Sequence, residues 1–574
     1  MSANTTSHRR IIIVLSIVGL LALCIILRLF YLQVIHGKTF ADKADRQYAP
    51  SSLSAFDRGK IFATGKDGTL IELASVTQGF KLAIVPSELI DKESTYTKLG
   101  SIIEIDREVF MKRADKLKDP YEEIAVHLSK ENADAISAFK IKGVYLYKDS
   151  WRAYPAGTLA AKTIGFVGYK GDILTGRYGL ERQYNDVLDR TGENVYASFF
   201  AEVFDNLKDS FTNKEGRGDI VTSIEPTVQA YFEKSLREAR SKFQAEQAGG
   251  IIMDPHTGEI IAMVGFPDFD PAMYGDAPSV SSYENPLVEH VYELGSIIKA
   301  LTMASGLDAG VVTEQTTYND TGCTVVDKAK VCNLDSRARG VVPMQKVLND
   351  SLNMGAMFVE GRLGNERFRD YMYRFGLNTK TRIDLPDEAL NIVTGLKSPR
   401  DIEYKTASFG QGIALSPVAA IRAFSALANS GVPVTPHIVR EIQYPEGTKK
   451  TIVYEALPSA IKPETSVTIS RMLTAAYDQS PAGVAGKAKN GRWTIAAKTG
   501  TAQIPKESGN GYYSDRYIHS MMGYFPAYEP KFIVLLYLYN PRNAGPALSS
   551  GTVAYVLSDV ANFLLNYYQV PPDR

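Results

Sequence analysis

A serine and a lysine three residues apart begin an apolar helical pattern near the middle of this chain. Ser296 and Lys299 stand in the sequence Tyr-Glu-Leu-Gly-Ser-Ile-Ile-Lys, which runs directly into Ala-Leu-Thr-Met-Ala. At this spacing the two side chains share one face of a helix. The serine gains from the positive end of the helix dipole, and a lysine kept out of water has a lowered pKa because desolvation disfavours its charged form. A neutral lysine can take the hydroxyl proton when the serine attacks a carbonyl group.

Two further short patterns follow in the second half of the chain. One is Ser-x-Asn, and the other is Lys-Thr-Gly followed by a threonine. Their residues are Ser351, Asn353, Lys498, Thr499, Gly500 and Thr501. A Ser-x-x-Lys pair alone occurs by chance in many helices, but the three patterns in this order are a specific combination. With them the chain resembles the penicillin-binding proteins, the transpeptidases that crosslink bacterial peptidoglycan.

The resemblance implies a serine acyl-transfer site. Ser296 is expected to attack the penultimate D-Ala–D-Ala carbonyl of a stem peptide, with Lys299 as proton acceptor. Ser351 is expected to relay a proton toward the leaving nitrogen, assisted by Lys498, whose charge also favours a neutral Lys299. By the same analogy, the backbone N–H groups of Ser296 and Thr501 form the oxyanion hole. Two threonines suit the terminal carboxylate, and the expected substrate-binding residues are Asn353, Thr499, Gly500 and Thr501.

Each of these residues also has an ordinary structural explanation. Lys299 could be a solvated surface lysine, Ser351 and Asn353 could cap helices, and Lys498 could be an edge-strand charge. The joint occurrence of the three motifs favours the catalytic interpretation.

Several alternatives share this chemistry. A β-lactamase hydrolyses its acyl-enzyme and is normally a secreted single domain, without a long region before Gly218. A D,D-carboxypeptidase differs only in using water as the acceptor. A bifunctional class A enzyme needs a glycan-polymerising domain before Ile220, and its acidic motif is not evident. From a different class, a mainly scaffolding protein would use its N-terminal half to recruit and regulate a glycan polymerase.

The N-terminal end is apolar. Residues 11–27 form a nearly unbroken apolar run, which 29–35 extend past Arg28. The basic residues 8–10 favour a cytoplasmic N-terminus, and no small residues mark a signal-peptide cleavage site. We therefore expect a single-pass protein of the plasma (inner) membrane with an extracytoplasmic catalytic domain. Its first segments are a cytoplasmic tail at 1–10 and an uncleaved transmembrane anchor at 11–35.

The region 37–218 alternates strand-like runs with polar helical stretches and contains no catalytic constellation. Four short sequences in it resemble structural boxes of the class B penicillin-binding proteins. They are residues 57–61, 152–157, 179–181 and Gly192. The first box departs from the family pattern because a second arginine, expected around 63–64, is absent. The resemblance implies that 37–218 is an elongated α+β pedestal for dimerisation or partner binding.

The region 219–574 mixes helices with antiparallel strands. The predicted elements are a helix at about 227–243, a hairpin at 250–263, strands around 493–504, 517–525 and 531–539, and a closing helix at 551–567. Helices before, between and after an antiparallel sheet indicate the α+β class. This agrees with the five-stranded sheet flanked by helices that the resemblance implies for the transpeptidase domain. Gly410-Gln411-Gly412 resembles another class B landmark, and 316–335 is expected to be a polar loop.

The charged residues, histidines and cysteines indicate which ligands and crosslinks the chain can have. Lys+Arg and Asp+Glu both number 64, so no global charge points to nucleic acid. With 7 histidines and no zinc-spaced Cys/His cluster, neither a metal nor another cofactor is expected. Cys323 and Cys332 are close enough to bridge across a short loop outside the cytoplasm, but two unpaired thiols are an equal alternative.

The resemblance also implies partners. Peptidoglycan stem peptides of the lipid-linked precursor polymer are the expected substrate, and β-lactam antibiotics are the expected inhibitors. A multi-spanning glycan polymerase of the shape, elongation, division and sporulation family is the expected partner of the anchor and the pedestal. The residues leave open whether the protein serves division or elongation.

Overall fold

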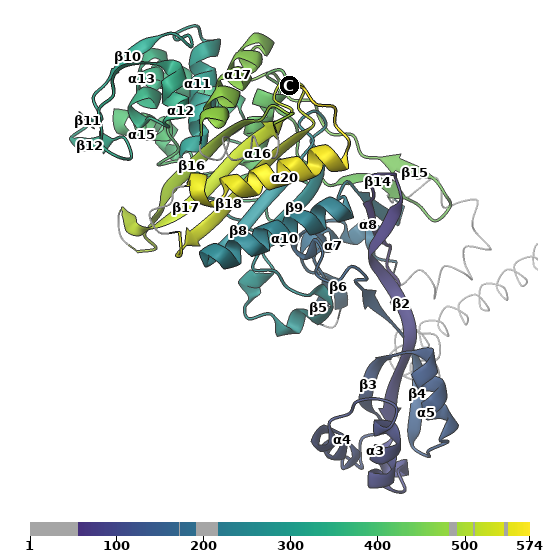
Figure 1. Ribbon diagram of the computed structural model, residues 1–574. Helices are drawn as coiled ribbons and strands as arrows, with labels where there is room; N and C mark the ends of the chain where they lie inside the picture. Colours follow the sequence, from purple (N-terminus) through teal and green to yellow (C-terminus); the bar gives the residue numbers. More distant parts are fainter. Residues whose placement is uncertain (1–55, 172, 191–215, 481–490, 509–510, 545–548) are drawn as a thin grey trace, which may run out of the picture. The chain divides into compact units, whose positions relative to one another are not determined.

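The computed structural model describes residues 56–171, 173–190, 216–480, 491–508, 511–544 and 549–574 (Figure 1). The predicted tail (1–10), the predicted anchor (11–35) and Gly192 lie outside these residues. Within the part described, no helix has both the length and the apolar character needed to cross a membrane.

The described chain separates into two compact units. One contains Thr77–Trp151, and the other contains Arg58–Val76, Arg152–Arg190 and the chain from 216 to its end. Two pieces of the N-terminal half thus belong to the same unit as the C-terminal half. The linear division into 37–218 and 219–574 stays a prediction.

A five-stranded antiparallel sheet forms the centre of the larger unit, in the order β16-β17-β18-β8-β9. The strands are β8 (Ala245–Met253), β9 (Ile260–Phe266), β16 (Ala496–Pro505), β17 (Tyr512–Phe525) and β18 (Phe532–Pro541). The predicted hairpin and the three predicted strands are confirmed, and so is the α+β class.

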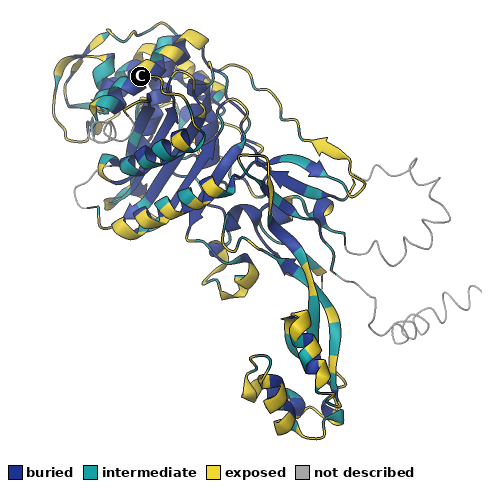
Figure 2. Cartoon of the chain, turned by 45° about the vertical axis from the view of Figure 1, so that its right-hand side comes forward, coloured by how far each residue is buried: buried dark blue, intermediate teal, exposed yellow. Residues whose placement is uncertain are grey.

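Both faces of this sheet are buried. In β18 the side chains of Ile533, Leu535 and Tyr537 join one apolar core, while those of Val534 and Leu536 join another. Successive side chains of a strand point to opposite faces, so an uninterrupted apolar run suits a strand buried on both sides. Figure 2 shows these strands as buried along most of their length.

Helices cover each face of the sheet. On one face α10 and α20 pack side by side across the strands (Figure 1). On the other face α11, α16 and α17 complete the second core. Their bounds are α10 (Pro226–Phe243), α11 (Lys299–Asp308), α16 (Pro417–Ala428), α17 (Pro463–Gln479) and α20 (Ala554–Tyr567). Pro226 is the first residue of α10, where a missing backbone N–H costs no helical hydrogen bond. The helices predicted at 227–243 and 551–567 are confirmed as α10 and α20.

The C-terminal half contains further strands and helices. They are β10 (Thr317–Asp320), β11 (Cys323–Val326), β12 (Ala329–Cys332), β13 (Gly340–Pro343), α12 (Met344–Asn349), α13 (Asn353–Leu363), α14 (Asn365–Arg374), α15 (Asp401–Ala407) and α19 (Ser549–Thr552). The prediction of a loop at 316–335 was wrong, because three short strands lie in it. No residue of β11 and β12 is buried, and the two buried residues of β10 are Tyr318 and Asp320, of which only one is apolar. The sequence of these strands therefore lacks the apolar alternation that signals a half-buried strand.

A second sheet in the larger unit combines strands from both ends of the chain. Its order is β15-β14-β7-β1 followed by the first part of β2. The bounds are β1 (Ile61–Thr64), β2 (Leu70–Ile84), β7 (Asp219–Thr222), β14 (Val439–Gln443) and β15 (Lys449–Thr451). Nearby in sequence lie α6 (Ala161–Ile164), β5 (Val167–Lys170), β6 (Ile173–Gly176), α7 (Gly179–Gln183) and α8 (Asn185–Leu188).

Three of the N-terminal boxes meet in one buried ion cluster. The Nε atoms of Arg58 and Arg152 each donate to a carboxylate oxygen of Glu181 over 2.6 Å. All three side chains are almost fully buried. Buried charges persist when they are paired and hydrogen-bonded, and the three boxes therefore meet in a structural cluster and not in a catalytic one.

The smaller unit packs short helices on two strands that pair with the second part of β2. Its elements are α3 (Lys92–Gly100), α4 (Arg107–Ala114), β3 (Glu122–Leu128), α5 (Lys130–Ala138) and β4 (Val144–Ala153). The charge-rich stretch 104–118 contains α4, which buries Phe110 and Ala114 and keeps its charged side chains outside.

Candidate active site

Ser296 lies in a 3₁₀ turn, Gly295–Ile298, directly before α11. Side chains at i and i+3 eclipse in this kind of turn, which places Ser296 in line with Lys299. Gly295 has a φ of +65°, and a Cβ there would approach the carbonyl oxygen of Thr501 to 2.8 Å. Glycine therefore lets the turn that carries the serine pack directly on β16.

Lys299 is not a solvated lysine, because it is only 1% exposed. Its Nζ donates to the backbone oxygen of Ser351 over 2.5 Å and to the Ser351 Oγ over 3.2 Å. Burial, and secondly the nearby charge of Lys498, lower the pKa of Lys299 well below its ordinary value. A lysine in this state can accept a proton from a neighbouring hydroxyl group.

Ser351 lies between two lysines. Lys498 Nζ donates to the Ser351 Oγ over 3.0 Å and to the Thr499 carbonyl oxygen over 3.0 Å. Ser351 follows α12 with a left-handed φ of 57°, which turns the chain before α13 begins. Burial lowers the pKa of Lys498 to about 7. The hydroxyl of Ser351 thus connects two amines whose pKa values are both lowered by burial.

The strand β16 presents Thr499 and Thr501 to the cleft and turns Gly500 inward. A Cβ at Gly500 would overlap the carbonyl oxygen of Leu294, so only glycine permits this close packing. Thr501 Oγ1 lies 2.6 Å from the Oγ of Ser549, whose hydroxyl also donates to the Gly500 carbonyl oxygen. Ser549 thereby holds the Thr501 hydroxyl in place.

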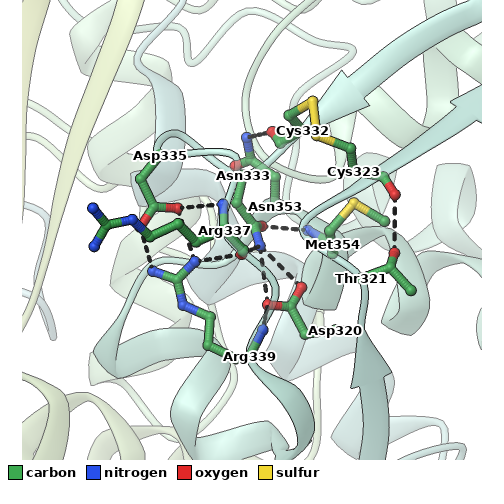
Figure 3. The surroundings of a disulfide bond; sticks show 10 residues. All are labelled: Asp320, Thr321, Cys323, Cys332, Asn333, Asp335, Arg337, Arg339, Asn353 and Met354. Atoms are coloured by element: carbon green, nitrogen blue, oxygen red, sulfur yellow. Dashed lines mark hydrogen bonds and ion pairs between the residues drawn. A yellow bond between two sulfur atoms is a disulfide. The ribbon is translucent and has the colours of Figure 1, made fainter.

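Asn353 begins α13, and its side chain is held by a disulfide-closed hairpin (Figure 3). Its Nδ2 donates to the carbonyl oxygen of Cys332 over 2.8 Å. Cys332 and Cys323 form a disulfide with an S–S distance of 2.13 Å, at directly paired positions of β11 and β12. Asn333 Oδ1 also accepts from the Met354 backbone N–H over 3.1 Å. The hairpin therefore contacts the first turn of α13 at two successive residues.

Six of the eight residues that the motifs predict line one cavity of about 710 Å³. They are Ser296, Ser351, Asn353, Lys498, Thr499 and Thr501. The other two, Lys299 and Gly500, are buried directly behind this lining. Among the described residues, no three His, Cys, Asp or Glu side chains lie together as a metal site requires.

The motifs did not point to three other residues of this cavity, Gln411, Gln503 and Ser549. Gln411 lies within the Gly-Gln-Gly sequence that resembles a class B landmark, and this resemblance could have marked it as a site residue. Gln503 follows Thr501 by two residues and so shares its face of β16, which strand periodicity indicates. Ser549 reaches the site from α19, and no local pattern marks it.

Two family models match the chain. The penicillin binding protein transpeptidase domain covers residues 248–558, and the penicillin-binding protein dimerisation domain covers residues 55–198. The first match contains all ten candidate residues, including the two cysteines.

Relatives and solved structures agree with these models. Stage V sporulation protein D of Bacillus subtilis is 30% identical, over 96% of this chain and 84% of its own length. Peptidoglycan D,D-transpeptidase FtsI of Buchnera aphidicola is 26% identical, over 98% of this chain and 96% of its own. The crystal structure of penicillin binding protein 3 from Mycobacterium tuberculosis, complexed with aztreonam, covers 91% of this chain and 98% of its own. It has a TM-score of 0.68 and 21% identity, so it shows a shared fold.

Proposed function

This chain belongs to the penicillin-binding protein transpeptidase family, and on that premise we propose that Ser296 is the nucleophile of its acyl-transfer reaction. The protein is a class B, serine-type peptidoglycan D,D-transpeptidase of cell-wall synthesis. It acts on peptidoglycan stem peptides and is acylated by β-lactams.

In the acylation step, neutral Lys299 takes the hydroxyl proton of Ser296. The Ser296 Oγ then forms a bond to the penultimate D-Ala carbonyl carbon. Backbone N–H groups of Ser296 and Thr501 stabilise the oxyanion that develops on that carbonyl oxygen. The C–N bond then breaks, and the proton reaches the leaving nitrogen of the terminal D-alanine through the hydroxyl of Ser351.

The second step forms the crosslink. An amine from a neighbouring stem peptide attacks the acyl-enzyme carbonyl carbon, loses its proton to the same basic groups and displaces Ser296 Oγ, which regains a proton. Lys498, with Thr499 and Thr501, holds the terminal carboxylate of the donor during the first step, and Asn353 hydrogen-bonds its backbone.

One observation carries the residue assignment, namely that Ser351 Oγ accepts from Lys299 at 3.2 Å and from Lys498 at 3.0 Å. The Ser351 hydroxyl therefore connects Lys299, the proposed proton acceptor, with Lys498, the proposed partner of the carboxylate. Both amines are buried, and burial lowers the pKa of each because it disfavours the charged form. A neutral amine is therefore easier to form here than on a solvated lysine.

The proposal extends to the membrane and to a partner. The apolar run at 11–35, preceded by basic residues, supports a single-pass anchor with a cytoplasmic N-terminus and an extracytoplasmic catalytic domain. On this basis 37–218 is a pedestal and 219–574 the transpeptidase domain. A multi-spanning glycan polymerase is the proposed partner of anchor and pedestal. Failure of the full-length protein to co-purify with, or to activate, the polymerase of its own membrane would contradict that part.

A fluorescent penicillin tests the catalytic assignment. We expect the full-length protein to form a covalent label that persists for hours, and Ser296→Ala to form none. Ser550→Ala is a matched control, because this serine lines the same cavity but has no assigned role. A label that clears quickly would indicate a β-lactamase, and an unlabelled native protein would favour the scaffolding alternative. With a peptide donor and an amine acceptor, D-alanine release without a crosslinked product would indicate a carboxypeptidase.

A further inference from the structure

A buried histidine lies next to Thr501 in the central sheet. His519 of β17 is paired in register with Thr501 of β16. Directly paired residues of antiparallel strands have their side chains on the same face of the sheet. Thr501 lines the active-site cavity, whereas His519 is only 3% exposed. The proposed reaction gives this histidine no role, although it stands beside a residue assigned to the substrate carboxylate.

The short helix α19 is bonded to both of these residues. Its last residue is Thr552, whose Oγ1 lies 2.8 Å from Nδ1 of His519. Its first residue is Ser549, whose Oγ lies 2.6 Å from Oγ1 of Thr501. All four side chains except that of Thr501 are almost fully buried. The helix is therefore attached to two neighbouring strands, at one end through His519 and at the other through Thr501.

The ring of His519 is neutral at the pH where the enzyme works. Burial lowers the pKa of His519 to about 4. The ring therefore brings no positive charge to the carboxylate site, in contrast to Lys498. Any effect of His519 on that site has to come from the position of α19.

The protons of two hydroxyl groups decide what Thr501 can offer to a ligand. The Ser549 hydroxyl contacts the carbonyl oxygen of Gly500, which can only accept, so the single proton of Ser549 is directed there. The contact between Ser549 and Thr501 then uses the proton of Thr501. In this arrangement the Thr501 hydroxyl has no proton left for a carboxylate.

A bound carboxylate requires the opposite arrangement. A carboxylate only accepts hydrogen bonds, so Thr501 has to turn its proton toward it. Ser549 can then turn its own proton from the Gly500 carbonyl to Thr501. A hydroxyl that accepts one hydrogen bond donates a stronger one, so Ser549 strengthens the bond from Thr501 to the carboxylate.

We propose that Ser549 and His519 are positioning residues of the carboxylate site. Ser549 orients the hydroxyl of Thr501 and donates to it when a carboxylate binds. His519 holds the helix that carries Ser549 in place, through the hydroxyl of Thr552. This inference rests on the proposed function, because that function assigns Thr501 to the terminal carboxylate of the donor. Neither positioning residue takes part in the covalent chemistry.

Benzylpenicillin and its methyl ester test the proposal on the full-length protein. Esterification removes the charge of the carboxylate and leaves the β-lactam ring intact. We expect the second-order rate constant for acylation of Ser296 to be about 100-fold higher for the acid, the worth of more than one charge-assisted hydrogen bond. Loss of later labelling by a fluorescent penicillin measures acylation by either compound.

Ser549→Ala tests the contact with Thr501. We expect it to reduce the preference for the acid about five-fold, because Thr501 loses the group that orients its hydroxyl and donates to it. An unchanged or larger preference would overturn the proposal, because a Ser549 that only withdraws the proton of Thr501 would hinder carboxylate binding. Ser550→Ala is the matched control on the same helix and should keep the native preference.

His519→Leu tests the other end of the helix. We expect the same reduction of about five-fold, and in His519→Asn, whose amide lies near the position of Nδ1, a preference within about two-fold of the native value. Thr552→Val removes the same hydrogen bond with little change of shape, so it replaces His519→Leu if that variant does not fold. His256→Leu, at an exposed histidine in a turn, is the control and should keep the native preference.

A double variant separates this role from a general structural one. Ser549→Ala/His519→Leu should reduce the preference no further than Ser549→Ala alone, because both residues act through one hydroxyl. If His519→Leu slowed acylation by the acid and by the ester equally, the histidine would only support the fold, and its assignment would be overturned.

The failure of this inference differs from a failure of the proposed function. Labelling of the native protein reports on Ser296 alone. Native protein that labels but reacts equally with the acid and the ester contradicts the carboxylate assignment of the proposed function, and this inference with it. A native preference for the acid that Ser549→Ala and His519→Leu both retain contradicts only this inference.

Discussion

The side-chain amide of Asn353 donates a 2.8 Å hydrogen bond to the backbone carbonyl of Cys332, half of a disulfide (Figure 3). A residue proposed to hold the donor peptide is thus oriented by a crosslinked hairpin. The orientation of such a donor matters, because small displacements of a positioning group reduce rates strongly.

We therefore expect removal of the disulfide to affect both stability and acylation. The crosslink joins residues 9 positions apart, so the double variant Cys323→Ser/Cys332→Ser should lose about 2–3 kcal/mol of unfolding free energy. Its second-order rate constant for penicillin acylation should fall about ten-fold. Denaturant unfolding and stopped-flow labelling measure the two effects. Val325→Ser, at an exposed position of the same hairpin, should leave both unchanged.

The two lysines predict a bell-shaped pH dependence of kcat/KM. Lys299 must be neutral to accept a proton, so activity rises as pH increases through its lowered pKa. Lys498 must be charged to complement the carboxylate, and its pKa is about 7, so activity falls above about pH 7. In Lys498→Met the alkaline decline should disappear, and the acidic rise should move to higher pH because the repelling charge beside Lys299 is gone. An alkaline decline that survives in this variant would contradict the assignment.

Lys498 also predicts a stability that depends on pH. Burial lowers the pKa of Lys498 in the folded protein from 10.5 to about 7, so between these values the unfolded chain binds more protons. Stability contributed at this site therefore increases as pH rises through that window and is lowest below about pH 7. Lys498→Met should raise Tm by at least about 2 °C at pH 6, with a smaller gain at pH 10. Calorimetry at both pH values checks this, and a gain that grows with pH would contradict it.

The close packing at Gly500 predicts that a larger residue at this position disturbs the active site. Gly500→Ala would place a methyl group on the carbonyl oxygen of Leu294, which belongs to the chain leading into the Ser296 turn. We expect a loss of about 1–3 kcal/mol in stability and a strong fall in penicillin labelling, because β16 and the turn must separate. Gly275→Ala is the matched control, since a Cβ there meets no atom within 4 Å. Normal labelling by Gly500→Ala would show that this contact is not needed.

Local patterns were sufficient for most of the elements that carry the site. The unbroken apolar run of β18 and the proline at the start of α10 both predicted their elements, because strand burial and helix initiation depend on residues close in the chain. Motif spacing also placed Ser296 and Lys299 on one face. The hairpin at Cys323 escaped prediction because its short exposed strands lack a buried face.

Other features depend on segments far apart in the chain. Arg58 and Arg152 are recognisable as boxes, but their shared partner Glu181 is visible only once the chain is folded. Ser549 likewise approaches Thr501 from a helix that no motif marks.

The sequence by itself determined the family, the α+β class, the identity of the three motifs and their order, because these are properties of residue types and spacing. Tertiary structure decided that Lys299 and Lys498 are buried around the hydroxyl of Ser351. The physical reason is that burial, and with it the charge state of an amine or a carboxylate, depends on which distant segments exclude water from it.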